Sequence, residues 1–303
     1  MLKLENIVKT YDKFIAVDDV SFEIPQGQIF GMLGPNGAGK TSIIRIITTI
    51  TRADSGKVWL GNQALSEKNA AQIGYMPEER GLYKKMKVGE HLLYLAQLKG
   101  MSYADARKEI IRWMEKLEIQ SWWDKKIEEL SKGMQQKVQF ISTIIHRPML
   151  LILDEPFTGL DPLNAALLQD EIFELHRNGT TIIFSTHRME QVEEICDSIV
   201  LINKGKNVLE GNVKDIRQQY RENTFEISFE GSVPDAISNM CSMAMVPKGS
   251  HLILKLNNGV RSNDVLQKFI ENGNQILSFH EKLPSLNEIF IKTVEGNLSP
   301  GTN

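Results

Sequence analysis

One stretch of the chain has the residue types and spacing of a phosphate-binding loop. It follows the pattern G-x-x-x-x-G-K-[ST] and consists of Gly34, Pro35, Asn36, Gly37, Ala38, Gly39, Lys40 and Thr41, with Ser42 directly after it. The glycines let successive backbone N–H groups point inward around phosphates, and the lysine ammonium reaches the terminal phosphates. The Thr41 hydroxyl is a ligand for Mg²⁺ in such loops. We therefore predict that this stretch binds the phosphates of a nucleotide.

Two acidic residues follow a short apolar run further along the chain. The run Leu150–Leu153 is typical of a buried strand, and it leads directly into Asp154 and Glu155. An acidic side chain at the end of a buried strand must face a metal ion or solvent. Asp154 suits the Mg²⁺ shell, and Glu155 is placed to polarise the water that attacks a γ-phosphate. At this stage any phosphate-loop ATPase or GTPase fits the sequence.

The segments around these residues predict a parallel sheet with helices. Residues 29–33 form a continuous apolar run before the glycine-rich loop, and an isoleucine-rich stretch follows it, which indicates strand, loop and helix. Residues 150–153 and 181–184 are two more buried strands, separated by a helical pattern over 164–176. Strands that alternate with helices favour parallel pairing.

Other segments predict antiparallel strands and a helical insertion. Residues 2–24 alternate between apolar and polar, which is typical of half-exposed antiparallel strands. The apolar spacing over 88–118 is helical, and Ser102 with Asp105 resembles a capping box, so we expect a helical insertion at about 85–145. Residues 198–203 and 207–211 are predicted to form a hairpin.

The length of the chain and a change in its pattern of apolar and polar residues predict two domains. A chain of 303 residues is about twice the usual domain length. Beyond residue 220 the pattern changes to alternating strands with glycine and asparagine turns. We expect a first domain over 1–220 and a small α+β domain over 221–303.

Composition and charge exclude several classes of protein. With 42% hydrophobic and 24% charged residues the chain is an ordinary globular protein, and the net charge of −3 provides no global attraction to nucleic acid. Cys196 and Cys241 lie in unlike contexts, so we interpret them as free thiols. No segment approaches the roughly 18 apolar residues needed to cross a bilayer.

A further set of motifs makes the prediction specific. The stretch Leu130–Lys137 contains Ser131, Lys132, Gly133 and Met134 and resembles the signature of the ATP-binding cassette (ABC) family, whose usual form is L-S-G-G-Q. Residues 159–162 resemble that family's D-loop, and His187 resembles its switch histidine. Residues 73–78 occupy the Q-loop position, and Tyr11 stands where the family places an aromatic residue against adenine. These motifs occur in the family order from about residue 1 to 211.

The resemblance implies a fold, cofactors and a mechanism. The fold is an α/β P-loop NTPase cassette, with a mixed sheet core, N-terminal antiparallel strands and a helical subdomain. ATP and Mg²⁺ are the implied cofactors. Two cassettes meet head to tail, so that Ser131 and Gly133 approach the γ-phosphate bound by the opposite copy. His187 then hydrogen-bonds the γ-phosphate, and Asp161 links the two sites.

Two positions depart from the family pattern. Glu78 stands where the family usually has glutamine, which places an additional negative charge beside the Mg²⁺ and the attacking water. We expect Glu78 to be a metal ligand and part of the catalytic site. Its charge is offset by Mg²⁺, or it takes up a proton, or it stays withdrawn until the two copies close, and the sequence leaves open whether turnover is reduced. Lys132 and Met134 replace glycine and glutamine of the signature, whereas Ser131 and Gly133, which must approach phosphate, are kept.

The resemblance also implies a cellular role. We expect the nucleotide-binding subunit of a membrane exporter, cytoplasmic and peripheral on the inner face of the cell membrane. Its expected partners are an integral membrane permease, which docks on the Q-loop and the helical insertion, and a second cassette, with no nucleic acid. The C-terminal segment around residues 283–290 looks like the accessory domain of bacterial sodium-efflux subunits. The alternatives are a soluble ABC ATPase without a transport function and an ATP-binding regulator of low turnover.

Several aromatic and basic residues have two possible interpretations. Trp113, Trp122 and Trp123 pack in the core of the helical insertion or form a docking surface, and core packing is the favoured interpretation. The lysines at 84, 85 and 87 form a solvated face or lie near lipid headgroups, and the solvated face is favoured. Tyr11 stacks on adenine or simply packs on the sheet.

Overall fold

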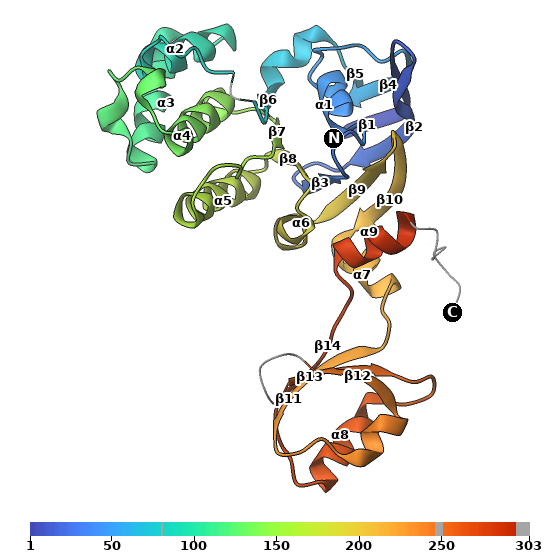
Figure 1. Cartoon of the computed structure of the whole chain (residues 1–303). Helices are drawn as coiled ribbons and strands as arrows, with labels where there is room; N and C mark the ends of the chain where they lie inside the picture. The colour runs from blue at the N-terminus through green and yellow to red at the C-terminus, as the bar shows by residue number, and fades with distance from the viewer. Residues whose placement is uncertain (80, 246–250, 295–303) are drawn as a thin grey trace. The chain divides into compact units, whose positions relative to one another are not determined.

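The chain folds into two compact units in the computed structural model, which describes residues 1–79, 81–245 and 251–294. The first unit comprises residues 1–213 and the second begins at Lys214 (Figure 1). The boundary after residue 220 that we expect from the sequence assigns helix α7 (Val213–Gln219) to the first domain. That assignment stays a prediction.

Two sheets form the framework of the first unit. One is antiparallel with the strand order β2-β1-β4-β5, and the other has six strands in the order β10-β9-β3-β8-β7-β6. In the second sheet all neighbours pair in parallel except β10, which is antiparallel to β9. The strands are β1 (Leu2–Tyr11), β2 (Phe14–Ile24), β3 (Ile29–Leu33), β4 (Ser55–Leu60), β5 (Gln63–Ala64), β6 (Ile73–Met76), β7 (Leu150–Asp154), β8 (Thr181–Thr186), β9 (Ser198–Asn203) and β10 (Lys206–Asn212).

The pattern of apolar residues explains the position of each strand. Every residue of β3, β7 and β8 is buried, as expected for parallel strands covered on both faces. In β2 the buried and accessible positions alternate near its end, as expected for a strand with one solvated face. Because β3 and β7 both end at the same edge of the parallel sheet, the loops that follow them lie close together.

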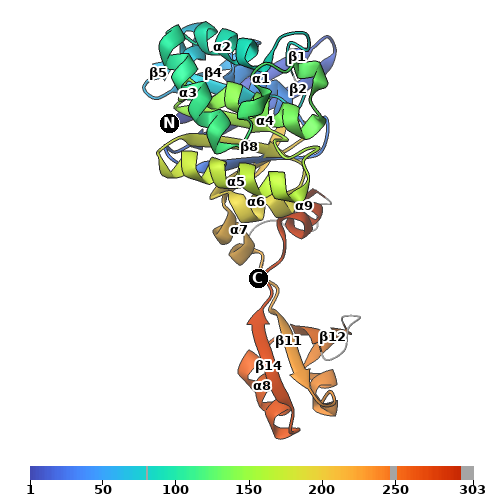
Figure 2. The ribbon, with the colours of Figure 1, turned by 90° about the vertical axis from the view of Figure 1, so that its left-hand side faces the viewer.

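The helices of the first unit surround these sheets. They are α1 (Lys40–Ile47), η1 (Glu67–Gln72), α2 (Val88–Leu98), α3 (Tyr103–Lys116), η2 (Gln120–Trp122), η3 (Ile127–Glu129), α4 (Lys132–Ile144), α5 (Pro162–Arg177) and α6 (Met189–Ile195). Helices α2, α3 and α4 lie together as a helical layer, with α5 beside them (Figures 1 and 2). At the start of α3 the amide of Asp105 donates to the Ser102 hydroxyl, so the predicted cap is present.

Trp113 and Trp123 pack against neighbouring helices, whereas Trp122 borders the cavity that also contains Ser131. Trp113 is buried and meets Phe140 of α4 edge to face at 6.2 Å, which agrees with core packing. Trp123 packs so closely on Gly89 of α2 that a Cβ there would lie 2.5 Å from its ring. Lys84, Lys85 and Lys87 are exposed, as both a solvated face and a contact with lipid headgroups require.

The described residues of the second unit form a small antiparallel sheet and four helices, of which η4 is a short 3₁₀ helix. Four strands pair in the order β12-β13-β11-β14, and α8 covers one face, where Phe229 and Phe269 meet at 4.8 Å between ring centroids. The elements are α7, β11 (Thr224–Glu230), η4 (Asp235–Asn239), β12 (Cys241–Met245), β13 (His251–Leu256), α8 (Ser262–Glu271), β14 (Gln275–Glu281) and α9 (Leu286–Val294).

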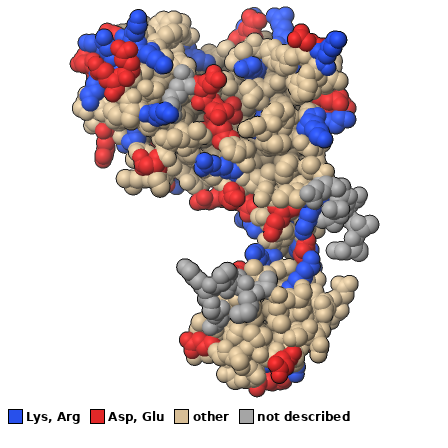
Figure 3. Space-filling model, in the orientation of Figure 1, with Lys and Arg blue, Asp and Glu red and all other residues tan. Residues whose placement is uncertain are grey.

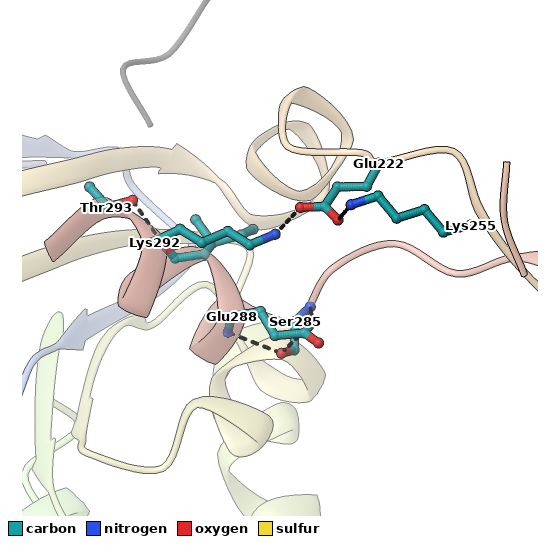
Figure 4. A network of polar contacts seen from close by, with 7 residues as sticks. Glu222, Lys255, Ser285, Glu288, Lys292 and Thr293 are labelled. Atoms are coloured by element: carbon teal, nitrogen blue, oxygen red, sulfur yellow. Dashed lines mark hydrogen bonds and ion pairs between the residues drawn. The ribbon is translucent and has the colours of Figure 1, made fainter. Parts of the chain in front are cut away.

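A polar network connects α9 with the sheet of the second unit. Glu222 accepts hydrogen bonds from Lys255 of β13 (2.6 Å) and from Lys292 of α9 (Figure 4). At the start of α9 the amide of Ser285 donates to the Glu288 carboxylate (2.7 Å), and the amide of Glu288 donates to the Ser285 hydroxyl (3.2 Å). This reciprocal cap satisfies two backbone donors that the helix itself leaves without partners.

The surface and the thiols agree with the sequence analysis. Acidic and basic side chains are interspersed over the face drawn in Figure 3. Cys196 and Cys241 are buried free thiols. Among the helices that the structure describes, none combines the length and the apolar character that a bilayer crossing requires.

Candidate nucleotide site

The glycine-rich loop joins the end of β3 to the start of α1, as the sequence predicts. Gly34 and Gly39 have φ values of 147° and 113°, in the region where glycine is favoured. A Cβ on Gly39 would lie 2.4 Å from the carbonyl oxygen of Ala16, and one on Gly34 would lie 2.1 Å from that of Ile202. The loop therefore has glycine where side chains have no room.

Lys40 lies inside this loop. Its ammonium donates hydrogen bonds to the carbonyl oxygens of Gly34 (2.5 Å) and Pro35 (3.2 Å). Burial lowers the pKa of Lys40, and the nearby carboxylates of Asp154, Glu155 and Glu78 oppose that shift. A buried ammonium on the first residue of a helix is suited to bind phosphate oxygens.

Asp154 is the last residue of β7 and is buried. Burial raises the pKa of its carboxyl, and the negative charges of Glu155 and Glu78 raise it further. The ionised form is therefore costly in this position unless a cation approaches. An oxygen ligand with this need suits a hard divalent cation.

Glu155 folds back onto strand β8. Its backbone has a φ of 50°, which is unusual for a residue with a side chain and is found at functional sites. The carboxylate accepts hydrogen bonds from the Thr186 hydroxyl (3.1 Å) and the backbone amide of His187 (2.9 Å). The Nδ1 atom of His187 lies 2.6 Å from Oε1 of Glu155. Glu155 and His187 thus form a directly connected acid–base pair, with the imidazole half exposed.

A cavity of about 230 Å³ brings most of the predicted nucleotide-site residues together. Its wall consists of Tyr11, Phe14, Ala16, Asn36, Gly37, Ala38, Gly39, Lys40, Thr41, Ser42, Glu78, Asp154 and Glu155. We call it the nucleotide cavity. Of the other predicted residues of this site, Gly34 and Pro35 contact Lys40, and His187 contacts Glu155.

Sequence reasoning missed Phe14 in this wall. Phe14 is directly opposite Tyr11 where β1 pairs with β2, and both side chains are accessible, with 63% and 39% exposed. Two exposed aromatic rings beside a phosphate-binding loop offer stacking surfaces for a flat base. The position of Phe14, three residues after Tyr11 and just beyond the hairpin turn, was the available signal.

Helix α4 connects the Q-loop segment with the acidic pair, and the sequence did not reveal this link. The side-chain amide of Gln139 donates to the carbonyl oxygen of Pro77 (2.8 Å), next to Glu78. The amide of Gln136 donates to the carbonyl oxygen of Pro156 (2.9 Å), next to Glu155. Both glutamines are buried on one face of α4, so this helix fixes the positions of the two segments relative to each other.

Ser131, Gly133 and Asp161 line a different cavity, of about 450 Å³, together with Lys132 and Lys137. We call it the signature cavity. Ser131 caps α4 by accepting a hydrogen bond from the amide of Met134 (3.3 Å), so the helix N-terminus points at this space. The lysine that replaces a signature glycine adds positive charge there.

Asp161 has a local structural role in the signature cavity. Its carboxylate caps α5 by accepting hydrogen bonds from the backbone amide (3.0 Å) and the side-chain amide (2.6 Å) of Asn164. These hydrogen bonds lower the pKa of Asp161. No residue of this cavity's wall belongs to the wall of the nucleotide cavity.

Comparison with known proteins identifies the family. The family profile described as ABC transporter matches residues 17–158. An uncharacterised ABC transporter ATP-binding protein, YhaQ of Bacillus subtilis, is 40% identical over 294 residues, which cover 97% of this chain and 98% of that protein. The chain belongs to the ABC transporter ATP-binding proteins. As an ABC ATPase it binds and hydrolyses ATP, and the α/β P-loop cassette fold predicted from the sequence is confirmed.

Other relatives extend this assignment. The Nod factor export ATP-binding protein I of Paraburkholderia xenovorans is 33% identical over 213 residues, covering 69% of this chain and 70% of that protein. A solved ATP-binding subunit of an ABC transporter superposes with a TM-score of 0.68 at 30% identity, covering 73% of this chain and 93% of that one. Residues 211–294 match the C-terminal domain of DrrA1-3-like ATP-binding proteins. The roles of individual site residues in this ABC protein stay predictions.

Proposed function

We propose that this ABC protein is the ATP-hydrolysing subunit of a membrane exporter and works as a head-to-tail pair of cassettes. The observation that carries the proposal is the separation of the nucleotide cavity from the signature cavity within one chain. A second cassette brings its signature cavity over the nucleotide cavity of the first. The γ-phosphate then lies between Lys40 of one copy and Ser131 of the other.

ATP is held by the loop, and Mg²⁺ fits the oxygens beside it. Thr41, Asp154 and Glu78 line the same cavity and offer a hydroxyl and two carboxylates, the ligand types that Mg²⁺ accepts alongside phosphate oxygens. The burial that makes ionised Asp154 costly favours a cation at its carboxylate. When bound, Mg²⁺ neutralises charge on the phosphates. Tyr11 and Phe14 flank the base.

Glu155 and His187 carry the proton chemistry in this proposal. The Glu155 carboxylate orients the attacking water and accepts its proton, while Thr186 and His187 hold the carboxylate in place. Nδ1 of His187 donates to Glu155, so the contact with the γ-phosphate falls to Nε2, which donates to it in the form of the ring that carries hydrogen on both nitrogens. Hydrolysis removes the phosphate that joins the two copies, so the pair opens.

A permease and a membrane location complete the proposal. The relative named for Nod factor export supports outward transport. The permease docks on a surface formed by the segment around Glu78 and the helical layer. These two parts lie side by side, because Gln139 of α4 hydrogen-bonds the carbonyl oxygen of Pro77. The protein therefore acts in the cytoplasm, on the inner face of the membrane. Its transported substrate contacts the permease.

The test is Glu155→Gln in the full chain. Glutamine keeps the size and one acceptor oxygen but cannot take a proton, so we expect ATP hydrolysis to fall by about 10²- to 10⁴-fold while ATP still binds. With ATP and Mg²⁺ the variant should elute as a dimer in size-exclusion chromatography. Glu174→Gln, on α5 and outside both cavities, is the matched control.

Two outcomes contradict the proposal. Unchanged turnover in the Glu155→Gln variant excludes Glu155 as the base. If the ATP-loaded variant remains monomeric, the two cavities do not meet across a pair of cassettes.

A further inference from the structure

A third cavity lies on the first unit, between the helical layer and the parallel sheet. It has a volume of about 420 Å³ and is bordered by α3, the end of α4, β7 and the end of α5. These helices lie beside one another in both ribbon views (Figures 1 and 2). We call it the Glu109 cavity. Its volume is in the usual range of small-molecule sites, about 300–1,000 Å³.

Glu109 of α3 is a buried carboxylate in the wall of this cavity, with 8% of the residue exposed. Its Oε1 accepts a hydrogen bond of 2.6 Å from a guanidinium N–H of Arg147. Its Oε2 is buried and has no hydrogen-bond donor among the described residues. The Nε atom of Arg112 lies 3.8 Å from Oε2, beyond hydrogen-bonding distance. A buried carboxylate that accepts only one hydrogen bond favours a cationic group beside it.

Arg112 and Arg147 lie at the opening of the Glu109 cavity. The side chains of Arg112 and Arg147 are 57% and 71% exposed, so most of their N–H donors are accessible. The Arg112 guanidinium lies 5.5 Å from the ring centroid of Trp113, which restricts its position. Arg147 has a φ of 54° directly before Pro148, a conformation that side-chain-bearing residues rarely adopt. Two guanidinium groups held at one opening are suited to bind a carboxylate.

The remaining wall is apolar. Ile144 and Leu151 are fully or almost fully buried, Leu175 is half-buried, and Met149 is 40% exposed at the rim. An aliphatic or aromatic group that enters here removes the accessible surfaces of Leu175 and Met149 from water. The cavity therefore presents three chemically different surfaces: an acceptor for an ammonium group, donors for a carboxylate, and an apolar floor.

We propose that the Glu109 cavity binds a free α-amino acid with an apolar side chain. The ammonium group pairs with the Glu109 carboxylate, the ligand carboxylate accepts from Arg112 and Arg147, and the side chain lies against the apolar wall. A zwitterion carries one positive and one negative charge, and the cavity offers a negative carboxylate from Glu109 and two positive guanidinium groups from the arginines. This inference is independent of the proposed function, since none of these residues belongs to the nucleotide or signature cavity.

The experiment measures binding of three probes to the full chain by isothermal titration calorimetry. L-Leucine carries all three groups, 4-methylpentanoate lacks the ammonium group, and 3-methylbutylamine lacks the carboxylate. We expect leucine to bind at least about tenfold more tightly than either fragment. Leucine should also raise the unfolding temperature of the chain more than the fragments at equal concentration.

Two variants assign the contacts. Glu109→Gln should reduce leucine affinity to that of 4-methylpentanoate, and Arg147→Gln should reduce it at least about tenfold. Arg147 is largely exposed, so its variant leaves the apolar packing unchanged, and circular dichroism checks that both variants fold. Asp264→Asn, which alters the exposed Arg261–Asp264 pair of the second unit, is the matched control and should leave binding unchanged.

The inference is overturned by any of three results. They are the absence of leucine binding to the unaltered chain at about 10 mM, equal affinity for the three probes, and unchanged leucine affinity in a folded Arg147→Gln variant. Tighter binding of 4-methylpentanoate than of leucine also overturns it, because the site then selects apolar carboxylates.

Discussion

The nucleotide cavity and the Glu109 cavity lie at opposite ends of the same strand. Leu151 near the start of β7 is in the wall of the Glu109 cavity, and Asp154 at its end is in the wall of the nucleotide cavity. Helix α5 has a similar arrangement, with Asp161 before its first turn in the signature cavity and Leu175 near its end in the Glu109 cavity. Both the nucleotide and Glu109 cavities contain a buried carboxylate near a cationic side chain.

The two cavities differ in whether the backbone or the side chains form their polar surface. In the nucleotide cavity the backbone shapes most of the wall, because glycines at positive φ turn the chain around the space that we assign to the phosphates. In the Glu109 cavity the polar contacts come from side chains on separate elements. A site built from backbone requires a particular contiguous sequence, whereas a site built from side chains does not. This comparison leads to three predictions, given from the largest expected effect to the smallest.

The first prediction concerns the backbone of the phosphate loop. Gly39→Ala places a Cβ 2.4 Å from the carbonyl oxygen of Ala16 at a φ of 113°, so the loop must move. We expect ATP affinity to fall by about 100-fold, since strain of this kind is worth about 1–3 kcal/mol before the clash is added. Equilibrium binding of a fluorescent ATP analogue measures the change.

Gly37→Ala is the matched control for that variant. Gly37 also has a positive φ, of 76°, but a Cβ there meets nothing within 4 Å. We expect an affinity loss of no more than about tenfold. Equal losses in the two variants would show that close packing against the Ala16 segment does not shape the loop.

The second prediction concerns the charge of Asp154. Burial raises its pKa from 3.8, so the folded state binds this proton more tightly than the unfolded state, and the associated stability is lost as pH rises through the raised pKa. Without nucleotide or Mg²⁺, Asp154→Asn should therefore stabilise the chain at pH 7 by about 1 kcal/mol. The difference from the unaltered chain should shrink as pH falls toward 3.8.

Urea unfolding across this pH range measures both quantities, with Asp264→Asn as an exposed-carboxylate control. With Mg²⁺ and ATP present the same Asp154→Asn change should reduce hydrolysis. A destabilised apo variant at pH 7 would contradict the interpretation that ionised Asp154 is costly when no cation is bound.

The third prediction concerns the stability contributed by Glu109. Its carboxylate is paired with Arg147, so Glu109→Gln removes a charge-assisted hydrogen bond, and we expect a loss of up to about 1 kcal/mol. The loss should be smaller at high salt because Arg147 is largely exposed. Urea unfolding at low and high salt measures it. An increase in stability, as expected for Asp154→Asn, would remove the contrast between the two buried carboxylates.

Much of the fold was predictable because its signals are local. The continuous apolar runs of β3, β7 and β8, the alternation in the first strands and the Ser102 cap each depend on neighbours within a few residues. The family was predictable for the same reason, since each motif is short and contiguous. The walls of the cavities were only partly predictable: Tyr11 was found, and Phe14 was not.

The sequence by itself determined the phosphate loop, the acidic pair at the end of β7 and the start of α4 at Ser131, because backbone geometry depends on the residues that follow one another along the chain. Tertiary structure alone decided that Gln139 holds the segment before Glu78 and that Glu155 folds back onto His187. It also decided that Arg147 reaches Glu109 from another element. Each of these contacts joins residues 32 to 62 positions apart, and only the packing of the helices and strands brings their polar atoms within hydrogen-bonding distance.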